Sequence, residues 1–142
     1  MVAVSDSHSN ESCPESTFEQ EVSVKYVDGF VVPVPKKKLD EYKKIARKMG
    51  KIMKEHGALD YVECVAEDVK KGKVTSFPQA VKLKRTETVI FSWITFKTRK
   101  HRDRVWEKTM SDPRMKDLMD PKGMPFDGQR MFFGGFEVMV QY

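Results

Sequence analysis

The segment 88-TVIFSWITF-96 has the pattern that decides the fold. It is rich in β-branched and aromatic residues, which are typical of strands. Its alternate side chains form two sets, and both sets are largely apolar. The first set is Val89, Phe91, Trp93 and Thr95, and the second is Ile90, Ser92, Ile94 and Phe96. The segment therefore predicts a strand that needs cover on both of its faces.

Three other segments are predicted strands. Residues 22–33 are rich in β-branched residues, and we expect this strand to stop at Pro33 because proline cannot donate a backbone hydrogen bond. Residues 58–68 (ALDYVECVAED) form the second strand of the chain, ahead of residues 88–96. Residues 130–140 (RMFFGGFEVMV) form the last strand, which is also apolar on both alternating faces.

Helices are predicted between these strands. Residues 36–57 place apolar side chains at three- and four-residue spacing, and Gly57 supplies a C-terminal stop. Thr98 is suited to cap a second helix over residues 99–110. A short third helix is predicted over residues 113–120, because proline is favoured at the first helical position. The apolar stripe of the first helix consists of Leu39, Tyr42, Ile45, Ala46, Met49, Ile52 and Met53.

The resulting order of elements is β-α-β-β-α-β. This order predicts an α+β, ferredoxin-like fold, with a four-stranded antiparallel sheet and the helices on one face. The basic connection over residues 69–87 is left without a role, because its length suits either a hairpin extension or a functional loop.

The two apolar faces of the central strand extend this prediction. Helices cover only one face of such a sheet, and monomeric soluble domains rarely expose large contiguous apolar patches. The simplest cover for the second face is the same face of a second copy. We therefore expect a homodimer of the dimeric α+β barrel type.

Composition indicates a soluble globular protein. The chain has 142 residues, of which 39% are hydrophobic and 33% charged. No apolar run approaches the roughly 20 residues that cross a membrane, and the first residues lack the basic and apolar regions of a secretory signal. We expect a cytoplasmic protein without a membrane partner.

The net charge of +5 is unevenly distributed. Residues 22–142 carry all 26 Lys and Arg and 16 of the 21 Asp and Glu, a balance of +10. We expect residues 1–21 to form a disordered polar and acidic tail, and residues 22–142 to form a single domain. The basic balance suits anionic ligands or nucleic acid, or simply solvated helix faces. The tail has no Lys or Arg, and its acidic residues are Asp6, Glu11, Glu15, Glu19 and Glu21.

No metal or cofactor is expected. The chain has three histidines and two cysteines, and their spacing matches no metal-ligand motif. Cys13 lies in the polar tail and Cys64 in an apolar run, so we expect no disulfide between them. Cys64 is interpreted as a small buried apolar residue.

The segment 124-MPFDGQRMFFGGFEVMV-140 allows three interpretations. A phosphate-binding loop needs a helix N-terminus after its glycines, and no helix follows Gly134 and Gly135. The pattern loosely resembles the aromatic strand of RNA-recognition motifs, but it lies on the last strand, and Glu137 would repel phosphate. We therefore do not expect nucleic acid as a partner. The third interpretation is a pocket wall or a tight contact with a helix, because glycine within a strand permits close approach.

Polar residues around such a pocket are the candidates for function. His101, in the first turn of the second helix, is the candidate acid-base group and the only catalytic candidate. Arg130, at the start of the last strand, is the candidate partner for an anionic group. The full set of candidate ligand-binding residues is Arg130, His101, Trp93, Phe132, Glu63 and Arg104.

Several longer blocks of sequence carry a family resemblance. They are 26-YVDGFVVPVP-35, 56-HGALDYVECVAEDV-69, 75-TSFPQAVKLK-84, 89-VIFSWITF-96, 112-DPRMKDLMDP-121 and 124-MPFDGQRMFFGGFE-137. Together they resemble the YbaA-like family, which groups bacterial proteins under a domain of unknown function. The resemblance implies a dimeric α+β barrel and carries over no catalytic residue. The wider barrel group includes cofactor-independent monooxygenases, haem-degrading oxygenases and small-molecule binding domains, which is an analogy of fold alone.

Three hypotheses for function follow. The first is a cytosolic homodimer that binds a small polar or anionic molecule between sheet and helices, with Trp93 and Phe132 as walls. The second is a cofactor-independent monooxygenase-like enzyme with His101 as base, so whether the protein is an enzyme stays open. The third is an RNA or protein interaction module that uses the basic face.

Overall fold

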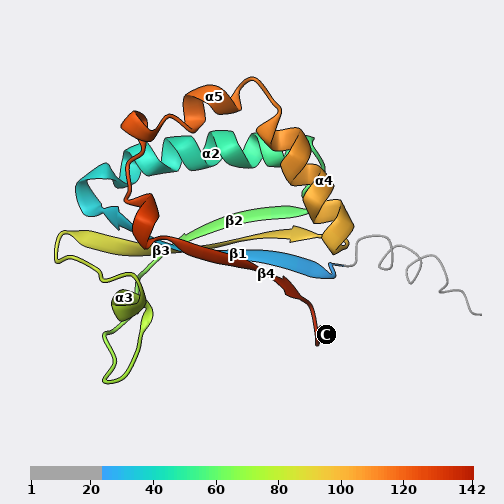
Figure 1. Cartoon of the computed structure of the whole chain (residues 1–142). Coiled ribbons are helices and arrows are strands. Elements are labelled where there is room, and N and C mark those ends of the chain that lie inside the picture. Colours follow the sequence, from blue (N-terminus) through green and yellow to red (C-terminus); the bar gives the residue numbers. More distant parts are fainter. Residues whose placement is uncertain (1–23) are drawn as a thin grey trace, which may run out of the picture.

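The computed structural model describes residues 24–142, and the predicted tail over residues 1–21 lies outside this range. Its centre is a four-stranded antiparallel sheet in the order β2-β3-β1-β4 (Figure 1). This order confirms the predicted ferredoxin-like arrangement. The strands are β1 (Tyr26–Pro35), β2 (Asp60–Val65), β3 (Glu87–Phe96) and β4 (Phe132–Glu137).

Three helices lie on one face of the sheet, and one short helix lies on the other (Figure 1). The first group is α2 (Leu39–Glu55), α4 (Arg99–Met110) and α5 (Met115–Leu118), and the fourth helix is α3 (Phe77–Ala80). Single 3-10 turns complete the described chain at η1 (Lys36–Lys38), η2 (Pro121–Gly123) and η3 (Gly128–Arg130). The third helix is shorter than the predicted range 113–120. The second and last strands are likewise shorter than predicted.

The first strand does not stop at Pro33 as predicted. It continues to Pro35, and Pro33 pairs with Val89 of β3. The N–H of Lys36 donates to the carbonyl of Thr86 on the β3 side of the strand. Because backbone groups alternate between the two edges of a strand, the backbone nitrogens of Pro33 and Pro35 point to the other edge, away from β3. Strand β4 pairs with β1 only from Tyr26 to Val31, so neither proline faces a partner that needs its missing N–H.

The main core lies between the sheet and α2 and α4. Alternate residues of β3 face these helices, and Phe96 and Ile94 pack with Met53 and Val105. Ile90 of the same set packs with Tyr42 at the start of α2. The predicted apolar stripe of α2 therefore packs against the sheet through residues such as Tyr42 and Met53, while Ile45 and Ile52 of the same stripe pack against α5.

The other face of the sheet is only partly covered. Val31 and Val89 lie on this face and are buried by Val81, with Leu83 beside them, so the connection over residues 69–87 packs here. Farther along the face Phe91, Phe132 and Phe136 are 43%, 45% and 62% exposed. The connection over residues 69–87 therefore covers part of this face, as the sequence requires. Phe91, Phe132 and Phe136 remain exposed and form an aromatic patch.

The predicted helix boundaries at Thr98 and Gly57 are confirmed. The Thr98 side chain accepts a hydrogen bond from the N–H of His101 and so caps α4. Gly57 follows α2 with a φ of +118°, a backbone conformation that favours glycine. A Cβ atom at this position would also lie 3.3 Å from Nε2 of His101. The turn between α2 and β2 therefore depends on glycine.

We expect Gly57→Ala to lower the free energy of unfolding by about 1–2 kcal/mol, because a side chain in the left-handed region is strained. Chemical denaturation measures this change. Gly123→Ala is the matched control, since Gly123 has no positive φ and a Cβ there would meet nothing within 4 Å. Equal effects of the two substitutions would contradict the assignment.

Candidate functional site

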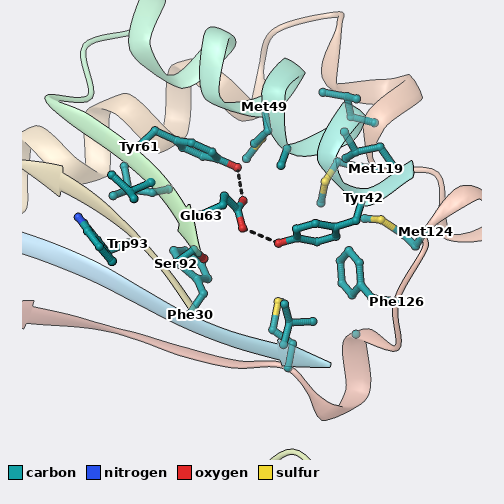
Figure 2. A pocket seen from close by; sticks show the side chains of 18 of the residues that line it. Phe30, Tyr42, Met49, Tyr61, Glu63, Ser92, Trp93, Met119, Met124 and Phe126 are labelled. Atoms are coloured by element: carbon teal, nitrogen blue, oxygen red, sulfur yellow. Dashed lines mark hydrogen bonds between the residues drawn. The ribbon is translucent and has the colours of Figure 1, made fainter. Parts of the chain in front are cut away.

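A cavity of about 290 Å³ lies between the helix-covered face of the sheet and helices α2 and α5. Its walls are almost entirely apolar and include Phe30 of β1, Met49 of α2 and Phe126 of the loop before η3 (Figure 2). Apolar cavities with a few converging polar groups are the usual form of small-molecule sites. This cavity is therefore the first candidate for function.

One carboxylate lies in this apolar cavity and is held by two tyrosines (Figure 2). The Tyr42 hydroxyl donates to Oε1 of Glu63 at 2.6 Å, and the Tyr61 hydroxyl donates to Oε2 at 2.8 Å. Tyr61 and Glu63 point to the same face because they are two residues apart on β2. Ser92 of β3 is the register partner of Glu63 and also lines the cavity.

Burial and the neighbouring carboxylate together keep the two tyrosines protonated. Burial first, and the charge of Glu63 second, raise the pKa of Tyr42 and of Tyr61 above their usual range. Both phenols therefore remain protonated at neutral pH and act as donors to Glu63. Each oxygen of a carboxylate has capacity for a further hydrogen bond beyond the one that a tyrosine donates.

Gly50 allows α2 to approach this cluster closely. It is buried in the middle of α2, and a Cβ atom there would lie 2.7 Å from Cδ1 of Tyr61. A glycine inside a strongly amphipathic helix is the signal by which this contact could have been found in the sequence. The helix thus places Tyr42 and the Tyr61 ring on either side of Glu63.

The cavity unites only two of the six predicted site residues, Glu63 and Trp93. Trp93 lines the cavity from β3. Its ring packs against the Phe91 ring, with 5.7 Å between the ring centroids, and both residues belong to the set that faces away from the helices. Phe132 lies on β4 in that outward-facing set as well. Arg104 is exposed on α4 and does not line the cavity.

His101 lies away from the cavity, at the start of α4. Its Nδ1 accepts a hydrogen bond from the N–H of Lys97 at 3.0 Å, and its ring packs edge-on against Phe96. Burial, followed by the charges of Lys97 and Arg104, lowers the pKa of His101 below its usual value. The geometry makes His101 a neutral part of the α4 N-terminus.

Arg130 has its charge partners within the protein. It donates to both oxygens of Glu87, at 2.8 and 2.6 Å, and to Asp127 at 2.9 Å. It also donates to the carbonyls of Val81 and Lys82. This guanidinium therefore joins the turn before β4 to the start of β3, and a ligand would have to compete with a buried carboxylate for it.

A second polar cluster was not found from the sequence. Asp28 of β1 is only 4% exposed. Its carboxylate accepts hydrogen bonds from Nη1 of Arg102 at 2.8 Å and from Nε1 of Trp106 at 2.7 Å. Burial raises the pKa of Asp28, and these two hydrogen bonds oppose that effect. An acidic residue on the helix-facing side of an apolar strand was the available signal. Trp106 also lines the cavity, so this cluster fixes one of its walls.

Two searches bear on other kinds of site. Within residues 24–142, no group of three or more His, Cys, Asp or Glu side chains is arranged to hold a metal ion. No helix in the same range is long and apolar enough to cross a membrane.

The sequence of this chain matches one family model and curated relatives. Residues 25–128 match the family described as "Protein of unknown function (DUF1428)". The chain is 52% identical over 117 residues to "Uncharacterized protein YbaA" of Escherichia coli strain K12, a match that covers 82% of this chain and 98% of that protein. The protein of the same name in Shigella flexneri matches with the same identity and coverage.

Solved structures show similarity of fold. A dimeric ferredoxin-like protein from an uncultured marine organism superposes with a TM-score of 0.50 at 8% identity, covering 88% of this chain and 96% of that chain. A NIPSNAP family protein of unknown function from Agrobacterium tumefaciens gives a TM-score of 0.49 at 14% identity and covers 80% of this chain and 87% of that chain. The first likeness supports the ferredoxin-like fold, and at such identity it shows the fold alone.

We expect Arg130→Met to lower the free energy of unfolding by about 3 kcal/mol, because it leaves the carboxylate of Glu87 buried without its partner. The Glu87 side chain is 5% exposed in the ion pair. Denaturation at neutral pH measures the loss, and Arg104→Met, an exposed arginine on α4, is the control.

Acid titration tests the same ion pair. The hydrogen bond from Arg130 lowers the pKa of Glu87 below its usual value of about 4.5. The pair therefore stabilises the fold above that pH, and its contribution is lost as the pH falls through the lower, folded-state pKa. The difference in stability between the wild type and Arg130→Met should shrink below pH 4.5. A difference that stays constant on acidification would refute the ion pair.

Proposed function

The chain belongs to the YbaA-like family of proteins of unknown function described as DUF1428, and we propose its function from the cavity itself. The cavity binds a small, largely apolar molecule that presents a hydrogen-bond donor or a positive charge to Glu63. The observation that carries this proposal is that Glu63 has the only charged side chain among the described residues lining the cavity.

The single carboxylate in the cavity favours a polar ligand over an anionic one. The two groups bonded to Glu63 are neutral phenols, and within the described residues no Lys, Arg or His forms an ion pair with this carboxylate. An anionic ligand would add a second negative charge in an apolar environment, where like charges repel strongly. A donor or cation gains a charge-assisted hydrogen bond instead. We therefore keep the polar ligand expected from the sequence, and in place of an anionic ligand we propose one that carries a hydrogen-bond donor or a positive charge.

An enzymatic role would use the same cavity. A carboxylate in an apolar cavity is suited to accept a proton from a bound substrate, and Glu63 then takes the role expected of His101. Ser92 and the two tyrosines would orient the substrate around it. Turnover of a ligand found by binding distinguishes this monooxygenase-like alternative from simple binding.

A second copy of the chain is proposed to cover the aromatic patch on the other face of the sheet. Phe91, Phe132 and Phe136 are exposed together on this face, and soluble monomers rarely expose a contiguous apolar patch of this kind. Gly29 and Gly134 are paired at the centre of this face, and the Phe136 ring lies over them, within 4.0 Å of where their Cβ atoms would be, so this ring is the surface that a partner would meet. The dimer and the cytoplasmic location expected from the sequence remain part of the proposal.

The ligand proposal predicts an order of binding among three compounds of similar shape. Phenylethylamine should stabilise the protein more than phenylethanol, and phenylacetate least, because only the first carries a positive charge. Thermal shift measures the order, since a ligand at 100 times its Kd adds about 2.7 kcal/mol of stability.

Variants locate the effect within the cavity. Glu63→Gln should remove the advantage of the amine over the alcohol, whereas Glu137→Gln, an exposed acid on β4, should preserve it. Ala46→Leu, which adds volume to the cavity wall, should weaken binding of both compounds. Tightest binding of the carboxylate, or an amine preference that survives Glu63→Gln, would refute the proposal.

The dimer proposal predicts that Phe136→Gln raises the dissociation constant of the dimer at least tenfold. Phe133→Gln is the matched control, because Phe133 lies on the same strand, is 67% exposed, and points to the helix side, where it stacks on Phe30. Sedimentation velocity over a range of concentrations gives both constants. A wild-type monomer at micromolar concentration would refute this interface.

A further inference from the structure

The floor of the cavity contains a row of three side chains that runs across the sheet. Phe30 of β1 pairs with Ser92 of β3, and Ser92 pairs with Glu63 of β2. Residues that are paired on neighbouring strands point to the same face of the sheet, and all three line the cavity. The backbones of Phe30 and Glu63 are therefore about 10 Å apart, with only the small Ser92 side chain between them. A ligand above Ser92 meets an aromatic ring on one side and a carboxylate on the other.

Aromatic side chains enclose this space from five separate segments of the chain. Figure 2 shows Tyr61 and Tyr42 on either side of Glu63, with Phe126 beside Tyr42. Because the rings come from different strands, helices and loops, they surround the space and do not form a single stack. The five residues are Phe30 of β1, Tyr42 of α2, Tyr61 of β2, Trp106 of α4 and Phe126 of the loop before η3.

The geometry of the rings leaves aromatic faces for a ligand. The rings of Tyr42 and Phe126 meet at 75° with their centroids 5.8 Å apart, and those of Phe30 and Trp106 meet at 52° with their centroids 6.4 Å apart. Neither pair is stacked face to face, so the two rings of a pair do not cover each other. The face of an aromatic ring carries partial negative charge and attracts a cation within about 6 Å of its centroid.

A primary ammonium group fits such walls poorly. Each of its three N–H groups needs an acceptor when it leaves water. Apart from the two phenols, which already donate to Glu63, the side chains that offer oxygen acceptors in the cavity are Glu63 and Ser92. An ammonium group that carries two N-methyl groups keeps its charge and needs one acceptor. Its methyl groups gain free energy when apolar walls bury them.

We propose that the cavity binds a small tertiary ammonium compound, whose single N–H donates to Glu63 and whose N-methyl groups lie against the aromatic rings. This inference rests on the ligand proposed above and narrows its class. Glu63 can accept the bond, because each of its oxygens has capacity beyond the one bond that a tyrosine donates. Tyr42 and Tyr61 thus contribute twice, through the hydroxyl that orients Glu63 and through the ring that faces the cation.

Calorimetric titration with three phenylethyl compounds tests the proposal. All three carry a positive charge at neutral pH and differ only in the number of N-methyl groups. N,N-Dimethylphenylethylamine should bind about fivefold more tightly than phenylethylamine, because methyl groups replace N–H groups that lack acceptors. It should also bind about fivefold more tightly than N,N,N-trimethylphenylethylammonium, which has no N–H to donate to Glu63.

Variants assign the two differences to two parts of the cavity. Phe30→Leu removes a ring but keeps an apolar wall, so it should abolish the advantage over the primary amine and preserve the advantage over the trimethyl compound. Glu63→Gln should diminish the advantage over the trimethyl compound and preserve the advantage over the primary amine. Met49→Leu, at an apolar wall position without a ring, is the control and should preserve both. Thermal denaturation checks that each variant folds, and Phe126→Leu takes the place of Phe30→Leu if that variant does not.

The outcomes separate this inference from the proposed function. A primary amine that binds as tightly as the dimethyl compound, with both tighter than phenylethanol, overturns the tertiary class and leaves the proposed function standing. An advantage of the methyl groups that survives removal of a ring also overturns the inference, because the aromatic walls would then contribute nothing. Absence of binding by all three amines overturns the inference and the proposed function together.

Discussion

The pairing of β1 with β3 over ten residues of each strand is the constraint on which the rest of the structure depends. Once this register is set, every side chain of the central strand belongs to one of two faces. Ile90, Ile94 and Phe96 then form the floor for α2 and α4, while Phe91 and Trp93 face away from them. A slip of one residue would exchange these sets and place Ser92 outside the cavity.

Three carboxylates lie in apolar surroundings, and their partners distinguish structure from function. Glu87 is bonded to Arg130, and Asp28 is bonded to Arg102, so each of these negative charges has a positive partner. Glu63 is bonded to two neutral phenols. No cationic side chain pairs with it in the described residues, and for this reason we propose a donor or cation as the ligand of the cavity.

Much of the fold could be predicted from local pattern. The strand over residues 87–96, the cap at Thr98 and the stop at Gly57 all lie where the sequence indicates them. Their signals act within a few residues, through alternation, a side-chain acceptor and a positive φ. The stop predicted at Pro33 was wrong because the tolerance of a strand for proline depends on which neighbour its N–H would face.

The candidate site was predicted less completely. Glu63 and Trp93 were selected for their polarity and size. Of the tyrosines beside Glu63, Tyr42 was placed only in the apolar stripe of the first helix, and Tyr61 was not singled out. Asp28 was missed, and Arg130 was expected to seek a ligand because Glu87, 43 residues earlier, is not visible as its partner in the sequence.

The sequence by itself determined the order of elements, the apolar faces of the sheet and the charge contrast between the first 21 residues and the remainder, because periodicity and composition are properties of the chain. Only the tertiary structure decided which carboxylate has neutral partners and which cation is already paired. The physical reason is distance: hydrogen bonds and ion pairs act over about 3 Å, and only folding brings Tyr42 to Glu63 or Arg130 to Glu87.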